Sequence, residues 1–442
     1  MPEFLKLLPP GEALAILLRS IPAPDPDDRA LSAETLEPLH ALGRFLAEDV
    51  RAPHSLPAFP RSSMDGFAVR ASDTFGASEA MPAYLTVVGE VSMGKASAFA
   101  LRPGTCALIH TGGMIPDGSD AVIMLEYTQA IRNAQVSDSF AGGTPGEIEI
   151  YRAVAEGENI IKVGEDVTEG QVVLAAGMRV RPAEIGGCMA LGISQLRVAK
   201  KPRVGILSSG DEVVSPGQSP LPGQVRDINS YSLAALIVQA GGEPVLYGIV
   251  PDDLVIMKSE AAKALTECDL VVITAGSSAS ARDMTAEAIG SLGDPGILVH
   301  GVNIRPGKPT ILAVCNRKIV IGLPGNPVSA LVIAGLFVVP VIEKLLGLKA
   351  TRPKPSVIAR LSMNVASQAG REDWIAVKLS PVIRNLPGET LIPELEDVEW
   401  GAEPVFGKSN LIFSLAAADG LVRIPPDATG LNAGEMVKVE FL

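Results

Sequence analysis

Carboxylates, hydroxyls and glycines follow four short apolar segments in the second half of the chain. The polar stretches read SSGDE at 208–212, DD at 252–253, GSSASARD at 276–283 and GLPGNPVS at 322–329. Small residues let a phosphorylated ligand approach the backbone, which supplies hydrogen-bond donors without side-chain bulk. Carboxylates are the hard oxygen ligands that Mg²⁺ takes in proteins. Together these residue types indicate phosphate-ester chemistry assisted by Mg²⁺.

The candidate residues divide by charge. The acidic residues suited to hold Mg²⁺ against phosphates are Asp211, Glu212, Asp227 and Asp283. Arg305 and Lys308, in NIRPGKP, offer positive charge to an oxyanion. The small and polar residues expected to line the ligand are Ser208, Gly210, Ser278, Pro324, Gly325, Asn326, Pro327 and Ser329. Each aspartate taken singly is equally well explained as a helix cap or a solvated loop residue, and their grouping favours a site.

The segment 318–342, KIVIGLPGNPVSALVIAGLFVVPVI, predicts how one of these stretches is built. A short β-branched strand ends in a glycine-bearing turn, and Asn326-Pro327 then suits the N-cap and first position of a helix. The free N–H groups and dipole at such a helix start favour an anion in the turn. The turn alone is also typical of an ordinary α/β core, so the residues upstream decide between the two interpretations.

The composition argues against several classes of function. The net charge of −13 is opposite to that of a surface that binds nucleic acid or anionic membranes. The four cysteines are scattered, with no CxxC or Cys/His cluster, which argues against structural zinc and fits reduced thiols in the cytosol. No GxxxxGK[ST] motif is present, which excludes a P-loop NTPase. We interpret the four histidines, which have no motif partners for a catalytic triad, as structural: His40, His54, His110 and His300.

No membrane association is expected. The apolar stretch 328–342 is too short for a span, contains Pro340 and lies within an α/β pattern, so we expect a buried helix. The N-terminus, MPEFLKLLPPGEALAILL, lacks a charged region ahead of an apolar core and so does not resemble a signal peptide. A cytoplasmic location follows.

Bringing the polar stretches together requires a parallel sheet, and the chain predicts one. From Pro202 onward, strand-like segments alternate with helical ones, the pattern of a doubly wound α/β domain with helices on both faces of the sheet. In such sheets ligands bind beyond the carboxyl ends of the strands, where the polar stretches fall. The expected strands are 204–207, 244–249, 270–274 and 319–321, and the expected helices are 230–239, 254–265, 284–292 and 327–346.

The first half of the chain predicts a mixed domain interrupted by a β-rich one. Helices are expected at 10–20, where leucines recur at helical spacing, and at 31–46. The polar turn SSMDG precedes a strand at 67–70, and short strands between Gly/Pro turns continue to residue 151. Strands and turns then lead into a helix at 182–191.

We therefore predict a multidomain fold of α/β plus β class. Residues 1–55 and 158–201 form an N-terminal mixed helix/strand domain, and residues 56–157 form a β-rich domain inserted in it. Residues 202–348 form the central α/β domain. Residues 349–442 show short strands, no helical stretch and no obvious chemistry, and are expected to form a small C-terminal β-barrel.

Seven motifs in order carry a family resemblance. They are SSMDGFAVRASD, HTGGMIPDGSDAV, GENIIKVGEDV, SSGDEVV, RDINSYSL, RPGKP and GLPGNPVSA. From residue 31 to residue 442 the chain resembles the molybdopterin molybdenumtransferase family, which is related to the carboxy-terminal domain of gephyrin. Each motif alone is weak, and their shared order makes the resemblance specific.

The resemblance implies a four-part chain with a molybdopterin-binding α/β domain, a homodimer, and the last step of molybdenum cofactor synthesis. In that step adenylylated molybdopterin is hydrolysed with Mg²⁺, AMP leaves, and molybdenum from molybdate is inserted at the dithiolene. The motifs imply catalytic or polar roles for Asp65, Thr111, Asp166, Glu212, Asp227 and Asp283, of which Glu212, Asp227 and Asp283 would hold the metal. Pro324, Pro327 and Lys308 match binding positions. Expected partners are a molybdopterin adenylyltransferase and molybdoenzyme acceptors.

One stretch departs from the family pattern. Where the family reads close to GGVSVGxxD, this chain has AGSSASARD at 275–283, with fewer glycines, one acid fewer and an arginine before Asp283. Side chains in place of glycine crowd a phosphate, and one ligand fewer weakens Mg²⁺ binding. An alternative is therefore a catalytically weakened paralogue that binds molybdopterin or its nucleotide as carrier, sensor or assembly partner. A third, an α/β nucleotide-binding protein unrelated to molybdenum, conflicts with the seven motifs. The choice between molybdate and tungstate stays open.

Overall fold

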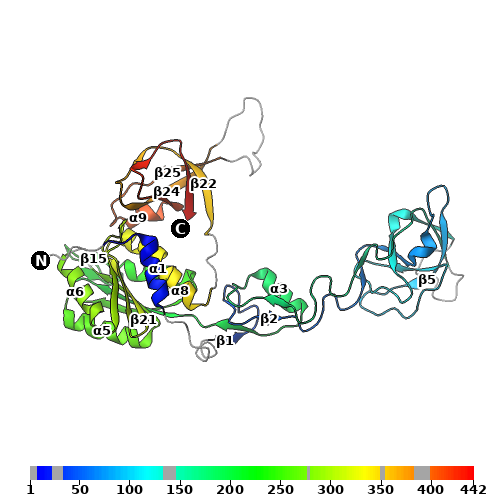
Figure 1. The fold of residues 1–442 in the computed structure, drawn as a ribbon, viewed down its shortest axis with the longest axis horizontal. Helices are drawn as coiled ribbons and strands as arrows, with labels where there is room; N and C mark the ends of the chain where they lie inside the picture. Colours follow the sequence, from blue (N-terminus) through cyan, green and yellow to red (C-terminus); the bar gives the residue numbers. More distant parts are fainter. Residues whose placement is uncertain (1–6, 22–32, 133–145, 276–278, 349–353, 383–398) are drawn as a thin grey trace.

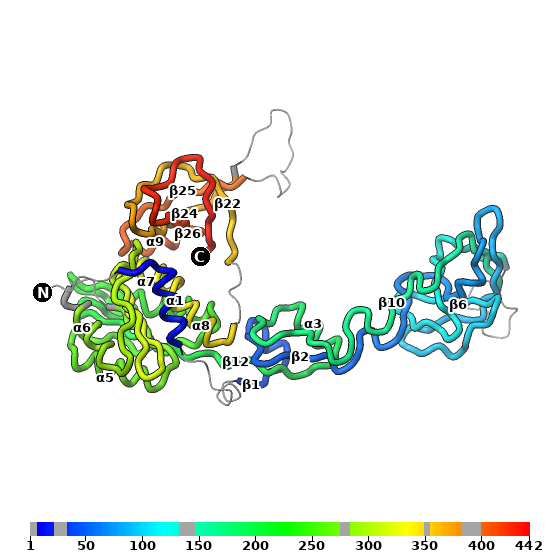
Figure 2. Tube along the Cα trace, viewed as in Figure 1, coloured from blue at the N-terminus to red at the C-terminus, as the bar shows by residue number. Residues whose placement is uncertain are grey.

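The computed structural model describes residues 7–21, 33–132, 146–275, 279–348, 354–382 and 399–442. The chain forms an elongated molecule, with the β-rich domain at one end and the α/β domain at the other (Figure 1). A small domain that carries α3 (Pro182–Ala190) lies between them, and the C-terminal domain sits beside the α/β domain (Figure 2). The predicted combination of α/β and β domains is confirmed.

A six-stranded mixed sheet forms the centre of the α/β domain. Its order is β16-β13-β17-β21-β20-β18. The four predicted strands are confirmed and run parallel: β13 (Arg203–Ser209), β16 (Glu243–Val250), β17 (Leu270–Ala275) and β21 (Lys318–Pro324). Two further strands, β18 (Pro295–His300) and β20 (Ile311–Cys315), were not predicted; they extend the sheet through antiparallel pairings of β20 with β21 and of β18 with β20. Four parallel strands therefore end at one edge.

Helices cover both faces of this sheet, as predicted. They are α4 (Asn229–Gln239), α5 (Leu254–Glu267), α6 (Ala279–Gly290) and a continuous run of α7 (Pro327–Ile333), the π-helical segment η4 (Ala334–Val338) and α8 (Val339–Leu345). Along β21, Ile319 and Ile321 belong to the core on one face, and Val320 belongs to the core on the other. A strand buried on both faces reads as a continuous apolar run, which is why these strands were recognisable.

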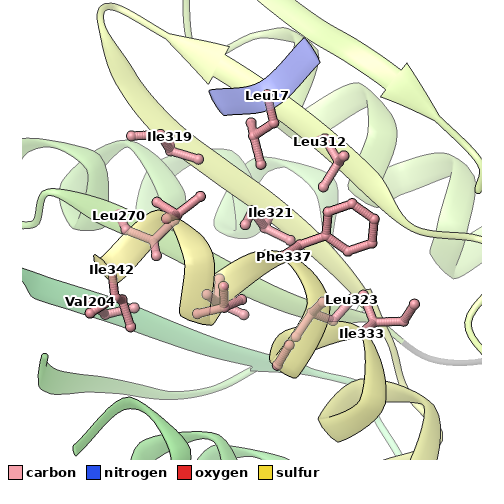
Figure 3. Packing of buried hydrophobic residues seen from close by; sticks show 14 of the residues in the cluster. Leu17, Val204, Leu270, Leu312, Ile319, Ile321, Leu323, Ile333, Phe337 and Ile342 are labelled. Atoms are coloured by element: carbon pink, nitrogen blue, oxygen red, sulfur yellow. The ribbon is translucent and has the colours of Figure 1, made fainter. Parts of the chain in front are cut away.

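Pro327–Leu345 has a mean hydropathy of 2.1 and, within the described residues, is the helical stretch long and apolar enough to cross a membrane. Its residues Ile333, Phe337 and Ile342 are fully buried against the sheet. Figure 3 shows Ile333 and Phe337 beside Leu323 and Ile321, and Ile342 beside Val204. This helix is part of the protein core.

Helix α1 (Pro10–Ser20) forms where it was predicted but belongs to a different domain. Ala13 and Leu17 are fully buried in the core that contains Ile319 and Phe337, and Figure 3 shows Leu17 above the sheet. The assignment of residues 10–20 to the N-terminal domain was wrong. Helical spacing identifies the apolar face of a helix but not the core against which that face packs.

The second predicted helix, 31–46, is also wrong. Residues Ala33–Leu36 form strand β1, which pairs with β12 (Leu196–Ala199), and turns follow it. Leu39 and Leu42 are exposed, and Pro38 interrupts the segment. Two shorter pairs join the outgoing and returning chain, β2 (Val50–Arg51) with β11 (Val172–Leu174) and β3 (Arg61–Ser62) with β10 (Ile160–Ile161).

The β-rich domain is built on a sheet of order β7-β4-β6-β5-β9-β8. Its strands are β4 (Gly66–Val69), β5 (Ala83–Glu90), β6 (Thr105–Ile109), β7 (Ala121–Met124), β8 (Thr128–Arg132) and β9 (Glu147–Ile150), with short 3-10 turns η1 (Ala71–Thr74) and η2 (Leu125–Tyr127). Strand β4 is fully buried between two apolar clusters, with Phe67 and Val69 in one and Ala68 in the other.

The C-terminal domain is a barrel-like sheet that includes one strand from the α/β domain. The order is β19-β24-β25-β22-β28-β26, and β24 also pairs with β26. The strands are β19 (Ile304–Arg305), β22 (Ser356–Leu361), β24 (Glu372–Val382), β25 (Glu399–Pro404), β26 (Gly420–Ile424) and β28 (Met436–Phe441). The expectation of no helix was wrong for α9 (Ile412–Ala416). Smaller pairs are β14 (Val213–Val214) with β15 (Val225–Arg226) and β23 (Val365–Ala366) with β27 (Gly430–Leu431).

Because Leu17 is buried against the sheet of the α/β domain, we expect Leu17→Ala to lower the free energy of unfolding of that domain by about 2–5 kcal/mol. Hydrogen exchange of the β21 and β6 amides would measure it, with β21 losing protection and β6 keeping it. Glu12→Ala, on the exposed side of the same helix, is the control and should change stability by less than about 0.5 kcal/mol. Loss of protection confined to β1 and β12 would contradict the domain assignment of α1.

Candidate functional site

A cavity of about 280 Å³ lies at the carboxyl ends of β13, β17 and β21. It brings together the end of β13, the start of α4 and the turn before α7. The residues that line it and carry polar groups are Ser208, Ser209, Glu212, Arg226, Asp227, Asn229, Thr274, Asn326 and Asn410. Of the predicted site residues, Ser208, Glu212, Asp227, Gly325, Asn326 and Pro327 are thus brought to one cavity.

Asp227 is the buried carboxylate of this cavity, with 7% of its surface exposed. Its Oδ1 accepts hydrogen bonds from Ser208 Oγ at 3.3 Å and from the Ser230 backbone N–H at 3.1 Å, in the first turn of α4. No donor within the described ranges is bonded to Oδ2. The side chain is therefore fixed by one oxygen, and its other oxygen is available to a ligand.

Two polar atoms next to Asp227 are buried and have no partner among the described residues. Asn229 Nδ2 donates to the carbonyl of Gly325 at 2.8 Å, but Asn229 Oδ1 and Ser230 Oγ have no hydrogen-bond partner in the part of the chain that the structure describes. A buried polar atom without a partner costs about 1–3 kcal/mol. Such atoms beside a cavity suit a site that receives a polar ligand or ordered water.

The turn before α7 is covered by the C-terminal domain. Asn326 Nδ2 donates to Ser409 Oγ at 3.0 Å, and the Val328 N–H donates to the Ser409 carbonyl at 3.1 Å. The expectation that this helix start presents free N–H groups is therefore wrong for the amide of Val328. The N-cap assignment of Asn326 is confirmed, although its side chain bonds to Ser409 instead of capping the helix.

A larger cleft of about 870 Å³ lies between the α/β domain and the C-terminal domain. It shares Gly325, Asn326 and Asn410 with the smaller cavity, so the two adjoin at this turn. Its lining carries four cationic side chains, from Arg305, Lys308, Arg371 and Lys408. Of the predicted residues, Arg305, Lys308, Pro324 and Ser329 lie here. The charged residues that line the smaller cavity are two carboxylates, Glu212 and Asp227, and Arg226, and we call it the acidic cavity. The larger cleft, lined by four cations, is the basic cleft.

Other predicted residues lie elsewhere. Asp65 and Thr111 are in the β-rich domain and Asp166 is in the connecting segment, far from both cavities within one chain (Figure 2). Gly210 lies in neither lining and shapes the turn: its φ is +141°, and a Cβ there would lie 2.7 Å from Glu212 Oε2. Asp283 is exposed on α6 and lines neither cavity. Ser278 lies outside the described residues.

Asp65 and His110 form a contact that the sequence did not reveal. The Thr111 N–H donates to Asp65 Oδ1 at 2.8 Å, which lowers the pKa of this carboxyl, and the nearby His110 lowers it further. His110 Nδ1 lies 3.6 Å from Asp65 Oδ1, and Nε2 lies 3.1 Å from Glu90 Oε1. The histidine that had no motif partner therefore contacts two carboxylates.

The described residues do not form a three-carboxylate metal site. Across the residues that the structure describes, no group of three or more His, Cys, Asp or Glu side chains is placed to hold a metal ion. Glu212 and Asp227 share the small cavity, whereas Asp283 does not line it. Sequence reasoning also missed Arg371, Lys408, Ser409 and Asn410, because the C-terminal region was taken to carry no chemistry.

Three family models match the chain in order. The model of the MoeA N-terminal region (domains I and II) covers residues 8–192, that of the probable molybdopterin binding domain covers 205–344, and that of the MoeA C-terminal region (domain IV) covers 391–442. The chain belongs to the MoeA family. The family predicted from the seven motifs is confirmed.

Relatives in the MoeA family are similar over nearly the whole chain. Molybdopterin molybdenumtransferase 2 from Mycobacterium tuberculosis is 33% identical over 93% of this chain and 95% of its own length. The molybdopterin molybdenumtransferase of Bacillus subtilis is 32% identical over 90% and 87%. The crystal structure of the molybdopterin biosynthesis MoeA protein from Pyrococcus horikoshii OT3 is 33% identical, with a TM-score of 0.79 over 99% of this chain and 100% of that one.

Beside the small cavity, Asp252 yields a prediction about pH. Its burial and the nearby charges of Asp211 and Glu212 raise its pKa, and its Oδ1 is buried without a partner among the described residues. When the pKa of a carboxyl is higher in the folded than in the unfolded protein, the ionised group destabilises the fold at any pH above the folded-state pKa. This destabilisation disappears as the pH falls from the folded-state pKa toward the unfolded-state pKa. We expect Asp252→Asn to raise the Tm at pH 7, with the difference shrinking toward pH 4.

The adjacent Asp253 is a matched control with the opposite expectation. It caps α5 and accepts from the N–H groups of Val255 and Ile256 at 2.9 and 3.0 Å. Asp253→Ala should lower stability by about 1 kcal/mol. An Asp252→Asn protein with a lower Tm at pH 7 would contradict the account.

Proposed function

We propose that this chain is a molybdopterin molybdenumtransferase, which inserts molybdenum from molybdate into adenylylated molybdopterin with Mg²⁺-dependent release of AMP. One observation carries the proposal: an acidic cavity and a basic cleft adjoin at the turn that contains Gly325 and Asn326. The substrate carries a phosphate ester near the position at which molybdate, an oxyanion, reacts. Its binding site therefore needs a metal-binding region next to a positively charged one. The names of the M. tuberculosis and B. subtilis relatives support the same reaction.

The acidic cavity fits Mg²⁺ held jointly by protein and phosphate. Mg²⁺ is commonly bound by one or two carboxylates together with water and substrate phosphates, and not by a full protein cage. Asp227, with Oδ2 unpartnered among the described residues, and Glu212 supply two carboxylates, and Asn229 Oδ1 adds a buried oxygen. When bound, Mg²⁺ would neutralise phosphate charge and polarise the phosphoryl group. We propose Asp283 as the third ligand on the motif match alone, since the structure places it outside the lining of this cavity.

The basic cleft is proposed to receive molybdate. Molybdate is a dianion, and Arg305, Lys308, Arg371 and Lys408 line this space. Arginine and lysine bind oxyanions through charge-assisted hydrogen bonds. Ser329, 4% exposed and also in the lining, places a hydroxyl beside the start of α7. The cleft thereby delivers the oxyanion next to the phosphate ester.

A weakened, non-hydrolysing paralogue remains the second candidate, and α6 supports it. The first turn of α6 contains no acidic residue, in keeping with the missing acid of AGSSASARD. Such a protein would bind adenylylated molybdopterin but release no AMP with Mg²⁺ and molybdate present. Binding and AMP release measured on the same sample separate the two functions.

We expect Asp227→Asn to slow AMP release about 10²–10³-fold, because removal of one preorganised electrostatic group at a reacting centre has an effect of this size. The assay follows AMP from adenylylated molybdopterin with Mg²⁺ and molybdate. Asp269→Asn is the control, since Asp269 accepts from the Arg203 N–H at the opposite edge of the same sheet. Near-native turnover of Asp227→Asn would remove this carboxylate from the reaction.

We also propose a homodimer whose site combines two chains. Asp65 and Thr111 match functional motifs, yet they lie in a domain far from the cavities of their own chain (Figure 1). A second copy is the straightforward source of a β-rich domain at each site. A molybdopterin adenylyltransferase and molybdoenzyme acceptors are the proposed partners, and the four buried free thiols support the cytoplasm as the location.

Mixed dimers test the shared site. If Asp65 acts on the partner's cavity, Asp65→Ala and Asp227→Ala chains are each inactive, but a mixture that exchanges subunits contains heterodimers with one intact site. We expect the mixture to recover about a quarter of the native AMP release, as random pairing forms half heterodimers with one of two sites intact. Mixing Asp227→Ala with Glu212→Ala is the control and should recover nothing. No recovery in the first mixture would refute the shared site.

A further inference from the structure

Asp373 is a fully buried carboxylate beside the basic cleft, with 0% of its surface exposed. It lies in β24, at the interface with the α/β domain. Arg371 pairs with it side-on, through Nε to Oδ1 at 2.7 Å and Nη2 to Oδ2 at 3.1 Å, and Ser367 Oγ donates to Oδ2 at 2.9 Å. Arg305 Nη1 lies 3.9 Å from the same Oδ2. One buried acid thus faces both cleft arginines.

Strand pairing accounts for this convergence of two domains. β19 runs parallel to β24, with Ile304 opposite Glu372 and Arg305 opposite Asp373. Arg305 comes from the α/β domain and Arg371 from the C-terminal domain, so Asp373 joins cations that are far apart in the sequence. Glu372, the preceding residue, pairs instead with Arg423 and accepts from Trp374 Nε1, so the two acids serve different partners.

The pairing leaves part of Arg371 available to a ligand. Asp373 occupies Nε and Nη2, and no acceptor among the described residues is bonded to Nη1. Arg371 lines the cleft. Arg305 is 66% exposed and makes its long contact with Asp373 from the side of the solvent. A guanidinium held on one edge presents its other edge in a fixed direction, which suits a tetrahedral oxyanion.

We propose that Asp373 is a positioning residue, which holds Arg371 and Arg305 side by side as the receptor for an oxyanion in the basic cleft. This inference rests on the proposed function, because it assumes that the cleft receives molybdate. Lys308 and Lys408 supply charge to the same space, and Asp373 fixes the geometry of the two forked cations.

Charge and geometry predict opposite results for removal of this carboxylate. Asp373→Asn removes one negative charge from the edge of the cleft, so a site governed by net charge would bind an anion more tightly. A site governed by position would bind it more weakly, since two long side chains regain rotamer freedom and the arginine fork is lost. The sign of the change therefore distinguishes the two accounts.

The experiment is a titration of the full-length protein with sodium molybdate at fixed ionic strength, by calorimetry. We expect Asp373→Asn to weaken binding about tenfold or more, the range of one or two hydrogen bonds to charged groups. In the AMP-release assay the KM for molybdate should rise while kcat at saturating molybdate stays near the native value. Tighter or unchanged binding, with only a lower Tm, would overturn the proposal.

Two further variants keep the test decisive if Asp373→Asn folds poorly. Arg371→Lys keeps the charge but loses the fork, so it should also weaken molybdate, and native affinity in this variant would equally overturn the proposal. Glu399→Gln is the matched control: Glu399 is a partly buried acid of the same barrel that pairs with Arg360, outside the cleft, and its loss should leave molybdate binding unchanged. If the native protein binds no molybdate, the proposed role of the cleft itself fails, and the inference falls with it.

Discussion

The position of the turn at 324–327 depends on the packing of β21 and the helix that follows it. Ile333 and Phe337 lie against the face of the sheet that carries Ile321 and Leu323, and all four are buried in one core (Figure 3). Burial of side chains of this size stabilises the arrangement by about 1.5–3 kcal/mol each. The strand and helix therefore meet at one fixed point, and both cavities are built around it.

The loop that carries Lys308 is tied to the same core. Gly307 has a φ of +114°, and a Cβ at this position would lie 2.2 Å from Ile333 Cγ1. A side chain could not be added without displacing either the loop or α7. The close approach of Gly307 to Ile333 therefore determines both the position of Lys308 in the cleft and the apolar packing beneath it.

The sequence predicted the elements best where both faces of an element are buried. The four parallel strands and their helices read as continuous or periodic apolar runs, and their polar ends converge as a parallel sheet requires. Prediction from the sequence failed where the position of a segment depends on contacts with residues far away in the chain. Leu17 packs on the sheet of another domain, and Leu39 and Leu42 are exposed despite their helical spacing. Arg371 joins Arg305 through a strand pairing that no local pattern indicates.

Segments near the N-terminus pack against segments that are synthesised much later, and this affects how the protein folds on the ribosome. Ala33 pairs with Ala199, and α1 packs on a sheet whose strand β21 ends at Pro324. Domains generally fold as units from the N-terminus during translation. In this chain Ala13 and Leu17 stay exposed until the sheet of the α/β domain has been synthesised. The whole β-rich domain emerges and folds before that point. The oldest part of the nascent chain is therefore among the last to be buried.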